Sequence, residues 1–389
     1  MPKKFQKIVF VQNQLADLGG VSKFTSVLGL GLQSRGYEVE FGAINDSLDG
    51  ERMPYPASVP EWTLVGSRKP PYRKDFTKFF GTRFQNYRFE KALERFRVSV
   101  ADAASQQFSQ YGKETLVIFT QVYARERIGN VVDFENRRGR FSVVSQYHNS
   151  FQAAKRGPDL RRVLSAYPND DQFVCLTAHD AAEFRKAGFN HSTFVLNPIE
   201  SPSTAPAPLD ARIAVSLGRY NHQKSLGDMI SAWSMIPESV NGWQLHLYGE
   251  GPEREQLESK IKSLNLENSV ILMGQTDDPK TALKSASVHV QSSRYEGLPL
   301  ALMEASIHGV PSVAYDCAPG IGEIITPDVT GILVPPGDQG ALAQGIRTLV
   351  EDADLRKEYG AAGLQHIKNK FDLEMILDEW EDLFAHLAR

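Results

Sequence analysis

The sequence is poor in cysteine and in long apolar runs, and each shortage excludes a class of protein. Its 389 residues include two cysteines, Cys175 and Cys317, which lie far apart and form no C-x-x-C motif. We therefore expect no disulfide scaffold and a reduced, cytoplasmic setting. No apolar run reaches the roughly 18 residues that a membrane-spanning helix needs, and the first residues lead into no signal-peptide core.

Motifs that mark bound cofactors and metals are missing as well. The opening strand, turn and helix contain no G-x-G-x-x-G, so a dinucleotide cofactor is poorly supported and we expect none. Asp277-Asp278 is not a D-x-D motif, and no cluster of His, Cys and Asp has the spacing of metal ligands. We therefore expect no metal site. The length predicts two or three domains, each able to bury a sizeable core.

Charge is unevenly distributed, although the formal net charge is only −4. Up to Asn197 the chain has 28 Lys and Arg against 20 Asp and Glu, a balance of +8. The remainder has 15 Lys and Arg against 27 Asp and Glu, a balance of −12. This separation indicates that the N-terminal half meets an anionic partner.

The stretch from Ser292 to Ala305 has the pattern of a strand-to-helix turn. Val288–Gln291 predicts a strand, and Leu300–His308 predicts a helix that the following glycine ends. Pro299 suits the first helical position, where a missing N–H costs nothing, and Gly297 lets a ligand approach the backbone. Free amides and the positive end of the helix dipole would then form an anion site suited to a phosphate.

Two carboxylates frame this turn. Glu296 lies in the loop, and Glu304 falls in the second turn of the predicted helix. Helical side chains lean toward the N-terminus of the helix, so Glu304 can reach back toward the predicted anion site. Carboxylates would repel a phosphate, so they are better explained as acceptors for hydroxyl groups that flank it. The alternative is that both are ordinary solvated acids near a helix start, where Glu is common.

The residues from Glu296-Gly297-Leu298-Pro299 to Glu304-Ala305 resemble the E-x7-E signature of the family-4 retaining glycosyltransferases, which have the GT-B fold. The resemblance implies that Glu296 contacts the sugar of a nucleotide-sugar donor and that Glu304 contacts its ribose. It also implies that the backbone of residues 297–299 binds sugar and phosphate.

A second group of donor-site residues lies earlier in the C-terminal half. Arg219 and Lys224 fall on the loop between the predicted strand Ile213–Leu217 and a helix for which Ser225 is the predicted N-cap. A guanidinium fork and an ammonium placed there could neutralise a diphosphate. The pair resembles the phosphate-binding Arg and Lys of the family, which often has Gly where Ser225 stands. The resemblance also places Gly274 where the family reads the nucleotide base through backbone groups.

The N-terminal half begins with a buried strand pattern at Lys7–Gln12 and a Gly19-Gly20 turn. Alone, that pair is a plain turn, but the resemblance implies that it approaches the donor phosphates. His148 falls just past the predicted strand Phe141–Ser145, at the end where ligands gather in parallel sheets. A lone histidine is more often structural than catalytic; the resemblance implies that His148 lies beside the donor sugar.

From Arg68 to Arg97 basic and aromatic residues alternate, with few acids among them. Such a segment suits an anionic membrane surface or a phosphate-rich polymer, and Arg83, Arg88 and Lys91 are the residues that we expect to carry the contact. The alternative is an ordinary amphipathic helix with aromatics in the core and bases in water. Nucleic acid would fit the composition, but nothing else in the chain supports it.

These patterns predict an α/β protein of two Rossmann-like domains facing a cleft, which the resemblance identifies as GT-B. We place the N-terminal, acceptor-side domain at 1–197 and the nucleotide-sugar-binding domain at 198–370, with a proline-rich linker at 201–208. Residues 371–389 are expected to form a helix that crosses back to the N-terminal domain.

The resemblance implies a retaining, metal-independent hexosyltransferase. Its donor would be a nucleoside-diphosphate sugar, with a UDP-sugar favoured, and its acceptor an envelope glycan, a teichoic-acid-like polymer or a glycolipid. The segment Asp316–Ile325 resembles a version found in enzymes that decorate cell-wall or capsular polymers, and Glu323 within it is either a donor-site residue or a helix-starting acid. Two other functions stay open: a nucleotide-sugar epimerase of GT-B fold, and a non-catalytic glycan-binding protein. Peripheral contact with the inner face of the membrane is expected.

Overall fold

The chain divides into two compact units, each built on a parallel sheet. Unit 1 comprises Met1–Val195 with Ile376–Arg389, and unit 2 comprises Leu196–Met375. The sequence places the corresponding boundaries after residues 197 and 370. The computed structural model describes residues 3–15, 19–46, 55–56, 58–67, 82–129, 140–167, 170–202, 204–236 and 242–387, apart from the side chains of 82–86.

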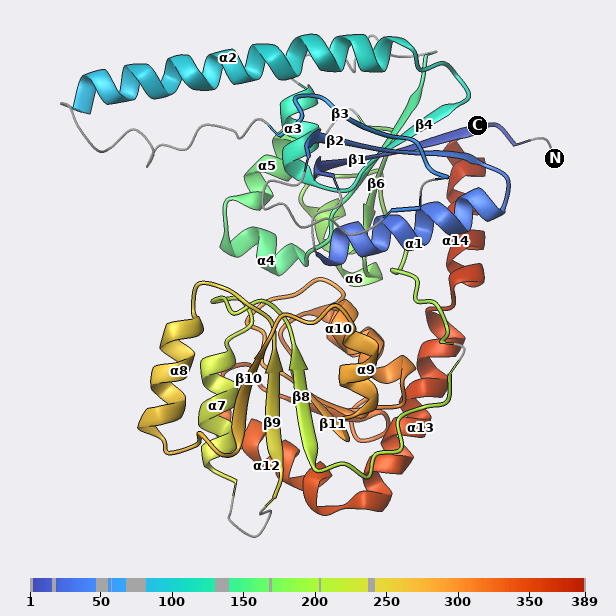
Figure 1. Cartoon of the computed structure of the whole chain (residues 1–389). Coiled ribbons are helices and arrows are strands. Elements are labelled where there is room, and N and C mark those ends of the chain that lie inside the picture. The colour runs from blue at the N-terminus through green and yellow to red at the C-terminus, as the bar shows by residue number, and fades with distance from the viewer. Residues whose placement is uncertain are drawn as a thin grey trace. The chain divides into compact units, whose positions relative to one another are not determined.

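Unit 1 contains a parallel sheet in the order β3-β2-β1-β4-β5-β6-β7 (Figure 1). The strand order reverses between β1 and β4, as in doubly wound folds. Its elements are β1 Lys7–Gln14, α1 Gly20–Ser34, β2 Glu38–Asn45, β3 Glu61–Thr63, α2 Thr82–Ser109, β4 Thr115–Phe119, α3 Val122–Gly129, β5 Ser142–Gln146, α4 Phe151–Arg156, α5 Asp159–Ala166, β6 Gln172–Cys175, α6 Ala178–Lys186 and β7 Ser192–Phe194.

The sequence explains why these strands are parallel and central. In β1, every side chain from Ile8 to Val11 is fully buried, which is typical of a strand covered on both faces. The predicted strand at Lys7–Gln12 is therefore confirmed, as is the strand before His148, which begins and ends one residue later than predicted.

Unit 2 contains a second parallel sheet, in the order β10-β9-β8-β11-β12-β13. Strands β8, β9 and β10 follow one another outward in one direction, and β11, β12 and β13 in the other. Its elements are β8 Ile213–Leu217, α7 Leu226–Ser234, β9 Gln244–Tyr248, α8 Arg254–Ser263, β10 Val270–Gly274, α9 Pro279–Lys284, β11 Val288–Gln291, α10 Leu300–Ile307, β12 Ser312–Tyr315, α11 Pro319–Ile324, β13 Gly331–Val334, α12 Gln339–Glu351 and α13 Ala353–Lys370.

The reversal of strand order between β8 and β11 determines where a ligand can bind in unit 2. In open α/β sheets, ligands bind outside the carboxyl ends of the strands at such a switch point. The loops after β8 and β11 are the two segments in which the sequence places Arg219, Lys224 and Glu296.

The proline-rich segment predicted as a linker is packed onto unit 2. The Ala207 amide donates to the His308 carbonyl at 2.8 Å, and Leu209 is buried in a cluster with Val215 and Val310. A polar, proline-rich composition therefore marks the edge of the unit here without making the segment a free tether.

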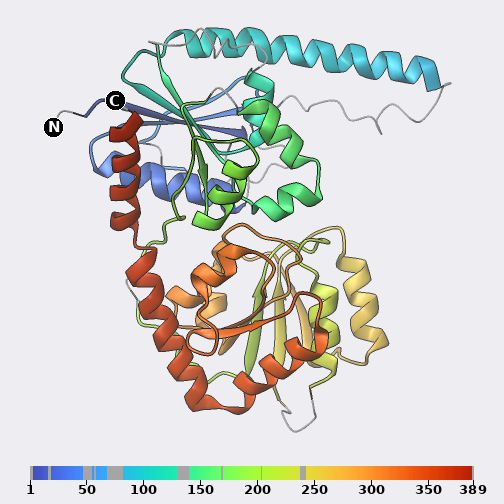
Figure 2. The same cartoon turned by 180° about the vertical axis from the view of Figure 1, so that it is seen from behind.

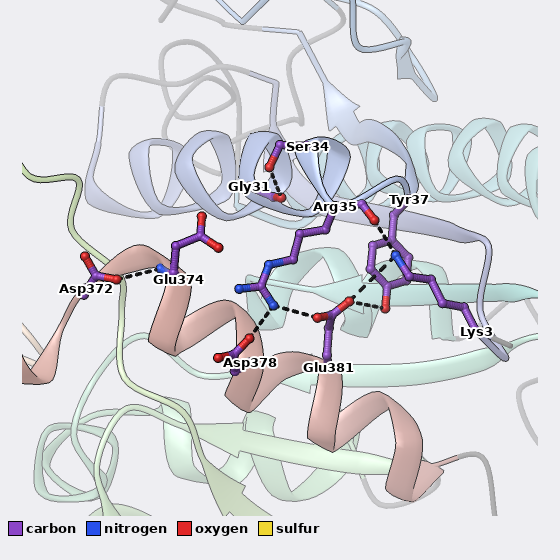
Figure 3. A network of polar contacts seen from close by, with 9 residues as sticks. All are labelled: Lys3, Gly31, Ser34, Arg35, Tyr37, Asp372, Glu374, Asp378 and Glu381. Carbon is purple, nitrogen blue, oxygen red and sulfur yellow. Dashed lines mark hydrogen bonds and ion pairs between the residues drawn. The ribbon is translucent and has the colours of Figure 1, made fainter. Parts of the chain in front are cut away.

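The last helix, α14 Leu373–Leu387, belongs to unit 1 from Ile376 onward. Figures 1 and 2 show it beside the end of α1, and Figure 3 shows the contacts. Arg35 donates to Asp378 at 2.5 Å and to Glu381 at 2.6 Å. The Phe384 ring meets the Phe5 ring edge-on with centroids 6.3 Å apart. The C-terminal helix thus supplies part of the core and surface of a domain that begins at the other end of the chain.

Helix α2 has two different halves. Phe96, Val100, Ala104 and Phe108, spaced four residues apart, are buried in the core of unit 1. The N-terminal half extends beyond the other elements of the unit (Figure 1). In the part of the chain that the structure describes, no helix is long and apolar enough to cross a membrane, and this includes α2.

Candidate active site

The loop after β8 carries the two predicted phosphate-binding bases. Arg219 is exposed, and Lys224 is half-buried immediately before α7. The stem of Lys224 lies over the backbone of Gly218, where an added Cβ would be 3.1 Å from Cε of the lysine. Gly218 therefore opens the path along which the lysine reaches the carboxyl end of the sheet, a role that the sequence alone did not reveal.

The turn after β11 carries the predicted donor-binding residues. Glu296 is 7% exposed, and Gly297, Leu298 and Pro299 are buried. Helix α10 begins at Leu300, so Pro299 is its N-cap and not its first helical residue, because its ψ of 116° is extended. The correction of one position leaves the chemistry intact, since the first-turn amides of a helix lack partners within the helix and can bind an anion.

The two turns contact each other. Lys224 Nζ lies 2.7 Å from Glu296 Oε1, in an ion pair whose side chains are 21% and 8% exposed. The Ser292 hydroxyl donates to the carbonyls of Lys224 at 2.9 Å and of Ser225 at 3.0 Å. The Gln223 carbonyl accepts from an amide of the second loop, that of Arg294, at 2.8 Å. Residues 72 positions apart in the chain thus form one rigid polar unit at the switch point of the sheet.

Ser225 departs from the family pattern, and the structure shows the cost. Its φ of 47° and ψ of 42° lie in the left-handed region, which only glycine adopts without strain. It occupies the N-cap position of α7 as predicted, but its hydroxyl accepts no hydrogen bond from a backbone amide of the helix and instead donates to the Asp228 carboxylate at 2.8 Å. A glycine at this position would adopt the same backbone conformation without strain.

Close backbone packing holds the loops in place. A Cβ on Gly249 would lie 2.0 Å from the Gly218 carbonyl oxygen, and one on Gly320 would lie 1.9 Å from that of Gly297. Real Cβ atoms do not approach so closely, so both glycines are required for the packing. Gly274 ends β10 with a φ of +76°, and its carbonyl accepts from the Gly249 amide at 2.8 Å.

The two other candidate acids of unit 2, Glu304 and Glu323, lie in different surroundings. Glu304 is half-buried in α10, one turn after its start, as predicted. Glu323 instead forms an ion pair with Lys370 of α13 at 2.5 Å, and its carbonyl accepts from the His366 ring. Glu323 is therefore tied to α13, which favours the structural interpretation of this residue.

Burial controls the protonation of the groups around Lys224 and Glu296. The thiol of Cys317 is buried, which raises its pKa to about 12, with Glu296 adding to the rise. His289, in β11, has its pKa lowered to about 3 by burial and then by the charge of Lys224. At neutral pH both groups are uncharged, so the ion pair is surrounded by neutral neighbours.

Three predicted residues lie in unit 1 at the carboxyl ends of its strands. Gly19 is the N-cap of α1 and Gly20 is its first residue. His148 follows β5, and its ring lies 4.7 Å from the ring of Phe24 on α1 in a T-shaped contact. Burial lowers the pKa of His148 to about 3, so the imidazole is neutral at pH 7. Its Nε2 is buried and has no hydrogen-bond partner within the described part of the chain.

The basic stretch is described only from residue 82 onward, so its first part lies outside the described residues, as does the side chain of Arg83. Arg88 and Lys91 are exposed on α2, and Tyr87 beside them is 61% exposed. Lys91 Nζ lies 5.8 Å from the centre of the Tyr87 ring. The stretch thus combines an exposed basic and aromatic end with a buried end, since Phe96 belongs to the core.

Across the described ranges, no group of three or more His, Cys, Asp or Glu side chains could hold a metal ion. The charged groups that the structure pairs at the switch point of unit 2 include Lys224 with Glu296 and Arg294 with Asp228.

Comparison with known proteins relates the chain to glycosyltransferases. Residues 200–366 match the family model described as glycosyl transferases group 1. The chain is 24% identical over 385 residues to an uncharacterised glycosyltransferase of Haemophilus influenzae, which covers 97% of this chain and 99% of that protein. It is 30% identical over 173 residues to the poly(ribitol-phosphate) α-N-acetylglucosaminyltransferase of Staphylococcus aureus, covering 44% of this chain and only 35% of that protein.

The fold also has close counterparts among solved structures. The structure of S. aureus TarM in complex with fondaparinux, α-GlcNAc-glycerol and UDP superposes with a TM-score of 0.79. The match covers 98% of this chain and 100% of that chain at 14% sequence identity. At this identity the likeness shows the fold, which is GT-B. The chain therefore has the GT-B fold and carries, in the unit that contains Lys224 and Glu296, a domain of the glycosyl transferases group 1 family.

Proposed function

We propose that the protein is a retaining, metal-independent glycosyltransferase that moves a hexosyl group from a nucleoside-diphosphate sugar to an acceptor of the cell envelope. A UDP-sugar is the favoured donor. The observation that carries the proposal is the contact between Lys224 and Glu296, 2.7 Å apart, at the carboxyl ends of β8 and β11. A cation for a leaving phosphate and an acceptor for sugar hydroxyls are the two groups that such a reaction needs side by side.

We assign the binding of the diphosphate to Arg219, Lys224 and the start of α10. A guanidinium can bind two phosphate oxygens at once, and an ammonium supplies a compact charge. The amides of the first turn of α10 add partial positive charge. Together these groups take the place of a metal ion in stabilising the charge that develops on the leaving diphosphate.

The rest of the donor is assigned to residues on the same edge of the sheet. Glu296 and the backbone of Gly297, Leu298 and Pro299 take the sugar, Glu304 takes the ribose hydroxyls, and the chain around Gly274 takes the base. We assign no carboxylate as a covalent nucleophile. The acceptor then attacks the same face of the sugar that the diphosphate leaves, which preserves the anomeric configuration.

Unit 1 contributes Gly19, Gly20 and His148 on the strength of the resemblance. Because the His148 imidazole is neutral at pH 7, its role is to exchange hydrogen bonds and not to supply positive charge. The low pKa also means that it stays neutral throughout the physiological range.

The proposed acceptor is an anionic polymer of the cell envelope. The S. aureus relative is named for transfer to poly(ribitol-phosphate), and the exposed bases on α2 of this chain have the complementary charge. Arg83, Arg88 and Lys91 would contact the polymer or the anionic inner face of the membrane, which places the enzyme in the cytoplasm at that surface.

The decisive experiment offers purified protein a panel of nucleotide sugars with and without a phosphate-rich polyol polymer. Release of the free nucleoside diphosphate only when the acceptor is present, with an α-linked product by NMR, supports a retaining transferase. Release of UDP without acceptor, together with an isomerised free sugar, would establish the epimerase instead. Glycan binding without turnover of any donor would establish the binding protein. Unchanged turnover after chelation with EDTA is expected for a metal-independent enzyme.

A further inference from the structure

The ion pair between Lys224 and Glu296 joins two groups that the proposed function assigns to different parts of one donor. Lys224 is assigned to the diphosphate and Glu296 to the sugar, yet their charged atoms lie 2.7 Å apart. A diphosphate that binds Lys224 must therefore compete with Glu296 for the same ammonium. We propose that this competition makes Glu296 a specificity residue that weakens the binding of the free nucleoside diphosphate relative to the intact nucleotide sugar.

Glu296 depends on its partner because of where it lies. Its side chain is 8% exposed and lies near the neutral, buried Cys317. A buried carboxylate that loses its cation is strongly destabilised unless another donor replaces it. Moving Lys224 from Glu296 to a phosphate is therefore costly when nothing else binds Glu296.

Lys224 has little freedom to move so that its ammonium contacts both the Glu296 carboxylate and the diphosphate closely. Its stem runs along the backbone of Gly218, where only the absence of a Cβ leaves room for it, since an added Cβ would lie 3.1 Å from Cε. Its carbonyl is held by the Ser292 hydroxyl, and its amide donates to the Asn221 carbonyl at 3.1 Å. Only the end of the side chain can shift, between the carboxylate and the place where a phosphate would lie.

The intact nucleotide sugar removes the competition between Glu296 and the diphosphate for Lys224, and the free nucleoside diphosphate restores it. Sugar hydroxyls donate hydrogen bonds, so a bound sugar can satisfy Glu296 while Lys224 turns to the diphosphate. After transfer, the free nucleoside diphosphate has no sugar hydroxyl that could donate a hydrogen bond to Glu296. The ion pair between Glu296 and Lys224 then forms again. The consequence is selective weakening of the product complex, which promotes release. This inference rests on the proposed donor site.

Calorimetry with UDP, GDP and ADP tests it, using the diphosphate that the parent protein binds best and its glucosyl and N-acetylglucosaminyl derivatives. Glu296→Gln keeps the shape and removes the charge. We expect it to bind the free diphosphate about tenfold more tightly, as release of a close charge pair allows. The preference of the parent for nucleotide sugar over diphosphate should shrink by at least the same factor.

The double-mutant cycle isolates the contact. In a Lys224→Met background, Glu296→Gln should no longer tighten diphosphate binding, because the cation over which the anions compete is gone. Glu323→Gln is the matched control, since it breaks a 2.5 Å ion pair with Lys370 in the same unit and should leave the affinity unchanged. Melting curves show which variants are folded, and Glu296→Met replaces Glu296→Gln if the latter is not.

Each remaining outcome is decisive. Unchanged or weaker diphosphate binding by the folded Glu296 variant would overturn the inference. Equal tightening in the Lys224→Met background would do the same, because it would show general charge repulsion and not competition for the lysine. If the parent protein binds none of the three diphosphates and none of their sugar derivatives, the proposed function itself fails.

Discussion

The two units share a parallel-sheet plan but place different polar side chains at the carboxyl ends of their strands. In unit 2, Lys224 and Glu296 pair with each other, and the Ser292 hydroxyl fixes the loop that carries the lysine. In unit 1, Gln146 and His148 at the end of β5 have buried side-chain atoms that find no hydrogen-bond partner in the described part of the chain. Unit 2 also has buried polar atoms without a described partner, in Gln291, Ser293 and Tyr315, so the units differ in the ion pair at the strand ends of unit 2 and not in how completely their polar groups are satisfied.

The largest expected effect comes from removing the cations of unit 2. Arg219→Ala and Lys224→Ala should each lower turnover by ~100-fold or more, as for loss of a donor that stabilises developing charge. Steady-state kinetics with the preferred donor measures this, and melting curves check the fold. Lys370→Ala, which removes a paired lysine elsewhere in unit 2, is the control. Near-normal turnover in either site variant would contradict the diphosphate role.

The charge contrast between the halves is tested by reversing the bases of α2. Replacing Arg83, Arg88 and Lys91 with Glu should weaken binding to a phosphate-rich polymer or to anionic vesicles tenfold or more, given about 1 kcal/mol for each basic residue at an anionic surface. Binding should also weaken with salt, which screens exposed charges over ~10 Å at 0.1 M. Cosedimentation and titration at two salt concentrations measure both effects.

A matched reversal of exposed lysines in unit 2, at Lys262, Lys280 and Lys357, serves as the control. If both triple variants lose binding equally, the effect is one of net charge and not of α2. Binding that ignores salt would reduce the α2 stretch to an ordinary solvated helix.

Each unit also carries one buried histidine with a pKa lowered to about 3, His148 in unit 1 and His289 in unit 2. In the unfolded chain each histidine is protonated near pH 6.5, whereas in the folded unit it is protonated only near pH 3. The stability that these residues contribute is therefore present above pH 6.5 and is lost as the pH falls, by at most about 1.4 kcal/mol per pH unit for each histidine.

Hydrogen exchange followed by mass spectrometry reads the two units separately. Between pH 7 and pH 5, after correction for the intrinsic exchange rate, both units should lose protection. His148→Asn should flatten the dependence in unit 1 and leave unit 2 unchanged. The same slope in unit 1 with and without His148 would show that other groups control its acid sensitivity.

Two buried glutamines in unit 1 differ in whether their side chains are hydrogen-bonded. Gln12 donates to the Tyr55 hydroxyl at 2.9 Å and accepts from Ser22 at 3.1 Å, whereas neither polar atom of Gln146 has a partner among the described residues. Gln146→Leu should therefore stabilise the protein by about 1 kcal/mol, and Gln12→Leu should destabilise it by a similar amount. Urea denaturation measures both. Destabilisation by Gln146→Leu would show that its amide is satisfied by groups outside the described chain.

The smallest effect is expected at Ser225. Ser225→Gly removes the strain of a left-handed backbone, at the cost of the hydrogen bond to Asp228 and of extra freedom in the unfolded chain. These terms nearly cancel, so the stability should lie within about 1 kcal/mol of the parent and on the stabilising side. A larger loss in chemical denaturation would mean that the contact with Asp228 outweighs the strain.

Local patterns predicted what local forces determine. The buried run of β1 and the strand-to-helix turn around Glu296 were visible because apolar periodicity, Pro299 and the glycines act within a few residues. The ion pair of Lys224 with Glu296 was not predicted, because it depends on how β8 and β11 lie beside each other in the sheet. Chain order says nothing about that neighbour relation.

Close packing was equally invisible in the sequence. Gly218, Gly249 and Gly320 matter because backbones from different loops meet there, and the sequence does not show which loops meet. Glu323 was left open between two roles, and its contact with Lys370 of α13, which favours a structural one, could be found only in the tertiary structure.

The path of α14 has a consequence for the order in which the protein can be made. Phe5 and Tyr37 pack against Phe384, which the ribosome adds only after the whole of unit 2. Domains generally fold N-terminal first during synthesis. Here unit 1 cannot complete its core until unit 2 has been translated, so the nascent chain carries an uncovered apolar surface while unit 2 is being made.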